Sequence, residues 1–180
     1  MRILKDNCVG LIIDMQDRLL PHIHENELLL RNTEILVKGL QALEVPILVT
    51  EQYTKGLGFT VDPIKQLFPS IQSFEKIAFS CCDDEQFAKK LVSLTQKCII
   101  IAGIETHVCV LQTAMDLLDN GFTPIVVEDC VSSRKPNDKL MAIKRIDKMG
   151  GVITTYESIL FELTRFAGNE TFKAVSKLVK

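Results

Sequence analysis

Apolar positions along this chain fall into two alternating kinds of segment. One kind is a short uninterrupted apolar run, such as CVGLII at 8–13 and CIIIA at 98–102, which is typical of a strand buried on both faces. The other kind carries apolar residues three and four positions apart, which is typical of an amphipathic helix. We expect strands at 8–13, 46–50, 71–74, 98–102, 123–127 and 152–154, and helices at 27–43, 85–94, 108–119, 137–149, 156–165 and 170–179.

Short apolar strands that alternate with helices predict an α/β fold with three layers (αβα), in which helices cover both faces of a parallel six-stranded sheet. We take the strand order to be 3-2-1-4-5-6. In sheets of this kind, ligands bind beyond the carboxyl ends of the strands, where the strand order reverses. The 180 residues contain no internal repeat or linker, so we expect a single domain over 1–180.

The composition narrows the classes of function. The net charge is -2 and no apolar run approaches the roughly 20 residues that span a bilayer, so we expect neither a nucleic acid nor a membrane as partner. The partner that we expect from the candidate chemistry below is a small-molecule substrate. Residues 1–7 lack a signal-peptide pattern, which favours a cytoplasmic location. The six cysteines form no C-x-x-C pair, so we expect reduced and mostly buried thiols.

Three chemically useful residues follow predicted strands. Asp14 follows the first strand, Lys76 the third, and Cys109 the fourth, where it opens a helix. A lysine cation and a helix N-terminus both favour a thiolate, and an aspartate within reach can accept the thiol proton. Each residue also has an ordinary interpretation. Asp14 could cap the turn after the first strand, Lys76 could be a surface lysine, and Cys109 could be a buried structural cysteine. Their convergence at one sheet edge favours a cysteine nucleophile with Asp14 and Lys76 as partners.

Four motifs together resemble a known family. They are VGLIIDMQ around Asp14, FEKIAFS around Lys76, AGIETHVCV around Cys109, and VVEDCVSSR after the fifth predicted strand. Over 8–158 the chain resembles the isochorismatase-like cysteine hydrolases, the superfamily that includes nicotinamidases and N-carbamoyl amidohydrolases. The resemblance implies a parallel sheet flanked by helices and a homo-oligomer.

The resemblance also implies roles for individual residues. The family's catalytic triad of Asp, Lys and Cys matches Asp14, Lys76 and Cys109. The family has a cis peptide four positions ahead of the cysteine, which here is the bond between Ile104 and Glu105. The oxyanion donors implied by the resemblance are the backbone N–H groups of Glu105 and Cys109.

The stretch VTEQYTKGLG at 49–58 narrows the resemblance to the isochorismatase-domain-containing subgroup, related to the so-called mitochondrial-associated ribonuclease proteins. Nicotinamidases carry an Asp-x-His metal motif after the second strand. This chain has Glu51, Gln52 and Tyr53 there, and no histidine between His24 and His107. We therefore expect no metal and no other cofactor.

The segment 51–69 has little regular pattern, and a loop of this length is usually functional, so we expect it to shape the substrate pocket. For Gln16 and Gln52 the alternative to a pocket role is solvent contact, and for Tyr53, Phe59 and Phe79 it is packing in the core. The leading interpretation is a hydrolase that cleaves a small amide or carbamoyl C–N bond through a cysteine thioester. A non-catalytic or scaffolding role is the alternative, and a nicotinamidase or ribonuclease role has less support. Candidate pocket residues are Gln16, Gln52, Tyr53, Phe79 and Thr106.

Overall fold

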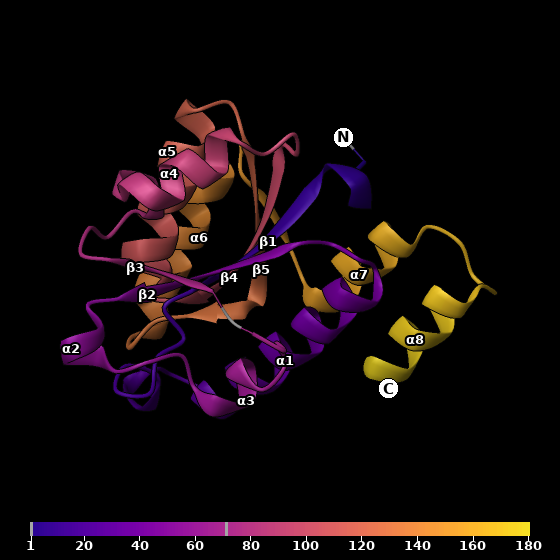
Figure 1. The fold of residues 1–180 in the computed structure, drawn as a ribbon, viewed down its shortest axis with the longest axis horizontal. Coiled ribbons are helices and arrows are strands. Elements are labelled where there is room, and N and C mark those ends of the chain that lie inside the picture. The colour runs from indigo at the N-terminus through magenta and orange to yellow at the C-terminus, as the bar shows by residue number, and fades with distance from the viewer. Residues whose placement is uncertain (1, 71) are drawn as a thin grey trace.

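A computed structural model of the protein describes residues 2–70 and 72–180, and a six-stranded parallel sheet of order β3-β2-β1-β4-β5-β6 lies at its centre (Figure 1). The strand order, the parallel pairing and the alternation with helices confirm the predicted fold class. The strands are β1 (Cys8–Ile13), β2 (Ile47–Gln52), β3 (Ser73–Lys76), β4 (Cys98–Ile104), β5 (Thr123–Ser132) and β6 (Val152–Thr154).

Helices form a layer on each side of the sheet. One layer contains α1, α7 and α8, and the other contains α4, α5 and α6 (Figure 1). The helices are α1 (Asn26–Ala42), α2 (Thr54–Leu57), α3 (Asp62–Lys65), α4 (Glu85–Val92), α5 (Leu111–Asp119), α6 (Pro136–Lys148), α7 (Tyr156–Thr164) and α8 (Glu170–Leu178), with short turns η1 (Lys5–Asn7), η2 (Leu20–His22) and η3 (Cys81–Asp83) and a π-helical turn η4 (Thr106–Val110).

Strand β1 shows why the strands read as continuous apolar runs. Neighbouring side chains of a strand point to opposite faces. Ile12 packs with Leu36 of α1 in one core cluster, whereas Leu11 packs with Leu117 of α5 in the other. Because both faces of the sheet are buried, almost every position of β1 must be apolar.

Strands β2, β3, β4 and β5 all run beyond their predicted carboxyl ends, and the largest difference is in β5, which ends at Ser132 instead of residue 127. β2 continues to Gln52 and β3 to Lys76, and these two residues are partners in the ladder. Polar side chains did not end the strands, because the ladder is made by backbone groups. Lys76 is therefore the last residue of a strand rather than the start of a loop. Ile71, where the third strand was expected to begin, lies outside the described residues.

Two further differences concern the loops that carry candidate site residues. The segment 51–69 contains the four-residue helices α2 and α3, although its pattern predicted irregular structure. The helix expected from residue 108 begins instead as the π-helical turn η4, and α5 starts only at Leu111. Asp84 caps α4, since its carboxylate accepts a hydrogen bond from the Phe87 N–H at 2.9 Å.

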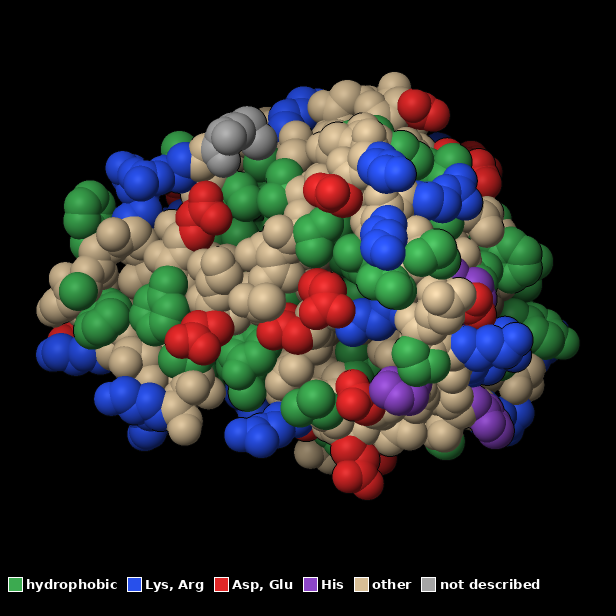
Figure 2. All heavy atoms as spheres, turned by 180° about the vertical axis from the view of Figure 1, so that it is seen from behind, with side chains coloured by type: hydrophobic (Ala, Val, Ile, Leu, Met, Phe, Trp, Pro, Cys, Tyr) green, Lys and Arg blue, Asp and Glu red, His purple; other side chains and the backbone are tan. Residues whose placement is uncertain are grey.

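The surface carries both signs of charge. Figure 2 shows basic and acidic side chains interspersed on the face it presents, in keeping with the net charge of -2. Within residues 2–70 and 72–180, none of the helices combines the length and the apolar character that crossing a membrane requires.

Candidate active site

The three residues predicted to form the site meet at the carboxyl edge of the sheet. β1 ends just before Asp14, β3 ends at Lys76, and β4 leads into the turn that carries Cys109. The Lys76 Nζ lies 2.7 Å from the Asp14 Oδ2, and the charge of the same carboxylate acts on the Cys109 thiol and raises its pKa. Residues separated by up to 95 positions in the sequence therefore form one cluster.

Asp14 is held in a fixed orientation inside the protein. Its φ of 52° lies in the left-handed region, which aspartate adopts more readily than most residues. The carboxylate is fully buried. Its Oδ1 accepts a hydrogen bond from the Thr50 hydroxyl at 2.8 Å, while Oδ2 faces Lys76. Both oxygens are thus oriented by protein contacts.

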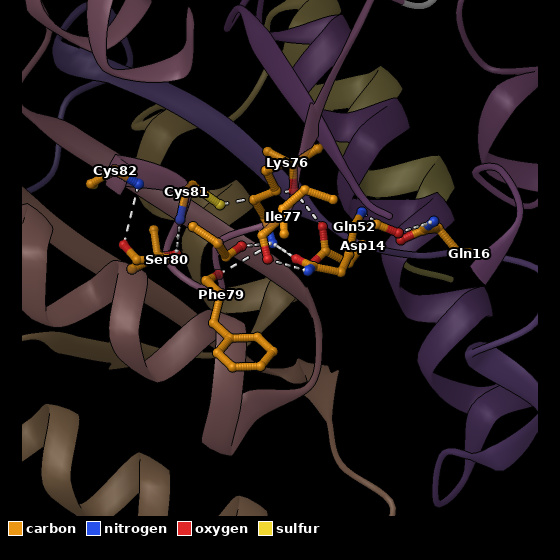
Figure 3. Close-up of polar contacts among 12 residues, drawn as sticks. Asp14, Gln16, Gln52, Lys76, Ile77, Phe79, Ser80, Cys81 and Cys82 are labelled. Carbon is orange, nitrogen blue, oxygen red and sulfur yellow. Dashed lines mark hydrogen bonds and ion pairs between the residues drawn. The ribbon is translucent and has the colours of Figure 1, made fainter. Parts of the chain in front are cut away.

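Lys76 is a buried ammonium surrounded by oxygen atoms (Figure 3). Its Nζ lies 2.7 Å from the Asp14 Oδ2 and 2.7 Å from the Gln52 Oε1, and 3.3 and 3.2 Å from the carbonyl oxygens of Ala78 and Phe79. Burial is the largest single influence and lowers the pKa of Lys76, but Asp14, with smaller contributions from Cys81 and Cys109, outweighs burial in sum and raises the pKa overall. Lys76 is therefore a fixed cation.

Cys109 lies in turn η4 with 6 % of its surface exposed. Burial, followed by the negative charge of Asp14, raises the pKa of this thiol far above its ordinary value, and the Lys76 cation opposes the rise only in part. The predicted effect of the lysine is therefore present, but burial and Asp14 outweigh it in the free protein. The thiol of the free protein is therefore protonated, and the Asp14 carboxylate is the nearby acidic group.

The turn between β4 and Cys109 contains the cis peptide bond between Ile104 and Glu105, as predicted. The buried Glu105 carboxylate accepts hydrogen bonds from the Arg134 backbone N–H at 3.1 Å and from its Nε at 3.0 Å. Within the described part of the chain, the Glu105 backbone N–H has no acceptor. The role of this N–H as an oxyanion donor stays a prediction.

Gly103 allows β1 and β4 to approach closely just before this turn. Its φ is +122°, and a Cβ placed on it would lie 2.0 Å from the carbonyl oxygen of Ile13. No side chain fits there, because that distance is far inside van der Waals contact. The pairing of β4 with β5 also shifts register between Ile101 and Gly103. The glycine thus sets where the turn leaves the sheet.

The two glutamines predicted to line the pocket are bonded to the protein. Gln16 is fully buried, and its Nε2 donates to the carbonyl oxygens of Gln52 at 2.9 Å and Gly58 at 2.7 Å. The Gln52 side chain contacts Lys76 and the backbone of the following loop (Figure 3). A pocket role for both glutamines stays a prediction.

The other pocket candidates differ in exposure. Tyr53 is 49 % exposed and Phe79 54 % exposed, so the alternative that they belong to the core is wrong. In Figure 3 the Phe79 ring points away from Lys76. Thr106 is fully buried in turn η4, and its hydroxyl has no hydrogen-bond partner among the residues the structure describes. Their contact with a substrate stays a prediction.

The position of the nicotinamidase metal motif does not fit a metal in this chain. The buried Glu51 carboxylate accepts hydrogen bonds from the N–H and hydroxyl of Thr60, each at 2.7 Å, and from the Ser73 hydroxyl at 2.8 Å. Tyr53 stands half-exposed where the motif has a histidine. In the described ranges, no three His, Cys, Asp or Glu side chains gather as a metal site would require. The Glu51 carboxylate joins β3 to the 51–69 segment instead.

Two residues that lie beside the site, Thr50 and Cys81, were not among the predicted site residues. Thr50 orients Asp14, and its hydroxyl also lies 3.8 Å from the thiol of Cys81, which is completely buried. Burial raises the pKa of Cys81 to about 12. A polar residue closing the apolar run PILVT was the available signal for Thr50. His107 contacts a different part of the chain, since its Nδ1 lies 2.9 Å from the Ser133 hydroxyl.

Comparisons with known proteins agree with this architecture. A family model described as the isochorismatase domain matches residues 8–158. The chain is 38% identical over 183 residues to isochorismatase family protein 1B of Dictyostelium discoideum, covering 99% of this chain and 89% of the relative. Among solved structures, it is similar to the MAR1 ribonuclease of Caenorhabditis elegans, with a TM-score of 0.92 and 34% identity over 99% of this chain and 92% of the other. It is also similar to the YcaC product of Escherichia coli, an octameric hydrolase of unknown specificity, with a TM-score of 0.93 and 25% identity over 99% and 89% of the two chains.

Proposed function

The chain belongs to the isochorismatase family, and on this basis we propose that it is a cysteine hydrolase that cleaves a small amide or carbamoyl C–N bond. One observation carries the proposal. The buried Asp14 carboxylate lies between a fixed ammonium, that of Lys76, and a protonated thiol, that of Cys109. A nucleophile, a base and a cation that balances the charge of the base are the parts that acyl transfer to a thiol requires.

The reaction proceeds in two halves. In the first, Asp14 accepts the thiol proton while the sulfur forms a bond to the substrate carbonyl carbon, and the oxyanion is stabilised by the N–H groups of Glu105 and Cys109. The protonated Asp14 then gives this proton to the nitrogen as the C–N bond breaks, which leaves a thioester and a free amine. In the second half, water attacks the thioester, Asp14 accepts a water proton, and the proton returns to the sulfur as the acid leaves.

Lys76 stays charged throughout this sequence. Its ammonium is already bonded to protein oxygen atoms, including Asp14 and Gln52. It therefore supplies a constant positive charge beside the carboxylate rather than a proton for the substrate. Such a fixed charge needs no reorganisation when negative charge develops on sulfur and oxygen.

A substrate screen tests the proposal. Purified protein is incubated with small amides, ureas, N-carbamoyl amines and nicotinamide, and with an RNA oligonucleotide because the C. elegans relative is named a ribonuclease. Cys109→Ala is compared with Cys82→Ala, a matched loss of a partly buried thiol. The proposal expects the wild type and Cys82→Ala to release amine or ammonia, and Cys109→Ala to release none. Equal hydrolysis by Cys109→Ala, or cleavage of RNA alone, would contradict it.

The octameric hydrolase among the similar structures supports a homo-oligomer for this chain. Light scattering coupled to size-exclusion chromatography measures its mass in solution. A mass above the 20.2 kDa of one chain supports an oligomer, and a mass of one chain at micromolar concentration contradicts it.

A further inference from the structure

The side chain of Gln52 bridges the Lys76 ammonium and the loop that follows it. Gln52 is the last residue of β2 and the ladder partner of Lys76. Its Oε1 lies 2.7 Å from the Lys76 Nζ, and its Nε2 donates to the carbonyl oxygen of Ile77 at 2.6 Å (Figure 3). The two ends of one amide group therefore make contacts of opposite polarity.

These contacts fix which way the amide points. A carbonyl oxygen such as that of Ile77 can only accept, so the amide nitrogen must face it, and the amide oxygen must then face Lys76. The backbone of Gln52 is also held on both sides. Its N–H donates to the Gln16 Oε1 at 2.8 Å, and its carbonyl oxygen accepts from the Gln16 Nε2 at 2.9 Å. Gln16 is fully buried, so the Gln52 amide is presented from a rigid support.

The contacts of Gln52 matter because they complete the surroundings of the ammonium. An ammonium has three protons and no acceptor. The oxygens of Asp14 and Gln52, each at 2.7 Å, take two protons, and the carbonyls of Phe79 and Ala78 share the third at 3.2 and 3.3 Å. Lys76 is only 2 % exposed, so water cannot replace a missing acceptor.

We propose that Gln52 is a positioning residue, which holds the Lys76 ammonium against Asp14 and thereby sets the reactivity of the Cys109 thiol. This inference rests on the hydrolase function proposed above, and it assigns Gln52 to the protein side of the site rather than to the substrate. The physical link is the charge of Lys76, which opposes the effects of burial and of Asp14 on the Cys109 pKa. Weakening the hold on the ammonium, or adding a negative charge beside it, makes the thiol harder to ionise.

Two substitutions separate this role from its alternatives. Gln52→Glu places a negative charge next to Lys76 and removes the donor to Ile77, and Gln52→Met keeps the length of the side chain without either hydrogen bond. Gln86→Met, on the exposed surface of α4, is the matched control. The assay measures the rate at which iodoacetamide alkylates Cys109 as a function of pH, with the modified peptide identified by mass spectrometry and the melting temperature recorded for every variant.

We expect alkylation at neutral to mildly alkaline pH to slow about tenfold in Gln52→Glu, which corresponds to about one pKa unit, and about threefold in Gln52→Met, with no change in Gln86→Met. A lower melting temperature with an unchanged alkylation profile in both variants would overturn the inference, because the role would be structural. A raised KM with unchanged kcat and unchanged alkylation would overturn it in favour of a substrate ligand.

The activity of Cys109→Ala distinguishes this inference from the proposed function. If Cys109→Ala hydrolyses the substrates of the screen as fast as the wild type, the hydrolase proposal itself fails. If Cys109→Ala is inactive and both Gln52 variants follow the wild-type alkylation profile of Cys109, only the role of Gln52 fails.

Discussion

The Asp14 carboxylate and the Lys76 ammonium form a direct ion pair of 2.7 Å, with side chains 0 % and 1 % exposed respectively. Removing two charges from water costs several kcal/mol per ion, and the pair recovers this only with good geometry and additional hydrogen bonds. Thr50 provides such a bond to the carboxylate and Gln52 to the ammonium. The pair is therefore a costly arrangement for stability alone, and the proposed hydrolase function gives a reason for its position near Cys109.

Loss of one member of this pair should be more damaging than loss of both. Asp14→Asn or Lys76→Met leaves one buried charge without its counter-ion, and each should lower the free energy of unfolding by about 3–5 kcal/mol. The double variant should recover much of that stability, because no charge remains buried. Urea unfolding monitored by circular dichroism measures all three.

Hydrolysis should not recover with stability in the double variant, since the base is gone. General-base loss costs about 10²- to 10⁴-fold in rate.

The control for the unfolding experiment is Glu34→Gln, which breaks the surface pair between Lys38 and Glu34. It should lower the free energy of unfolding by no more than about 0.5 kcal/mol. If the double variant loses as much free energy of unfolding as the Asp14 and Lys76 single variants lose together, the two charges are not coupled.

Gly103→Ala should disrupt the turn that carries Cys109. The new Cβ would lie 2.0 Å from the Ile13 carbonyl oxygen, and the φ of +122° adds strain, so we expect a loss of about 4 kcal/mol or more together with loss of hydrolysis. Gly121→Ala isolates the backbone contribution, because φ there is +75° with no atom within 4 Å of the added Cβ. It should cost only about 1 kcal/mol. Equal melting temperatures for the two variants would be inconsistent with this packing.

Stability should fall in alkaline solution because of buried thiols. Burial raises the pKa of Cys8 and of Cys81 from 9.0 to about 12. Between these values the folded protein keeps protons that the unfolded chain has lost, so the free energy of unfolding declines as pH rises, by up to about 1.4 kcal/mol per pH unit for each thiol. Urea unfolding at a series of pH values should give a shallower decline in the Cys8→Ala, Cys81→Ala double variant. If the free energy of unfolding falls equally steeply with pH in the wild type and the double variant, the buried thiols of Cys8 and Cys81 are not the cause of the decline.

Glu51 should act in structure rather than in metal binding. Glu51→Gln replaces one acceptor oxygen by an amide donor, which then faces the donor groups of Thr60 or Ser73. Because a hydrogen bond is lost and a buried polar group is left without a partner, the free energy of unfolding should fall by about 1–3 kcal/mol. Treatment of the wild type with EDTA should leave its melting temperature and hydrolysis unchanged. A drop in either after EDTA, restored by a divalent cation, would point to a metal site.

The sheet could be predicted from the sequence because burial on both faces leaves continuous apolar runs. The ends of β2 and β3 could not, since Glu51, Glu75 and Lys76 read as loop residues. Their backbones nevertheless continue the ladder, in which Glu51 pairs with Glu75. Whether a charged residue ends a strand depends on the neighbouring strand, which the local pattern does not contain.

The members of the site were predicted by their convergence at one edge and by resemblance to a family, but their electrostatics were not. A helix N-terminus and a lysine suggested a thiolate at Cys109, whereas burial and Asp14 raise the pKa of the thiol. Burial is a property of the packed structure. For the same reason, the contacts of Thr50 and Gln52 with the ion pair had no signal beyond their polarity.

The most direct test of the account is to find where the acyl group resides during turnover. The wild type is quenched in acid while it hydrolyses an amide identified in the screen, because acid preserves thioesters, and the peptides are analysed by mass spectrometry. If catalysis passes through a thioester on Cys109, the mass of the acyl group is found on the peptide that contains Cys109 and on no other cysteine peptide. Continued turnover without any adduct on Cys109, together with an unchanged rate in Cys109→Ala, would contradict it.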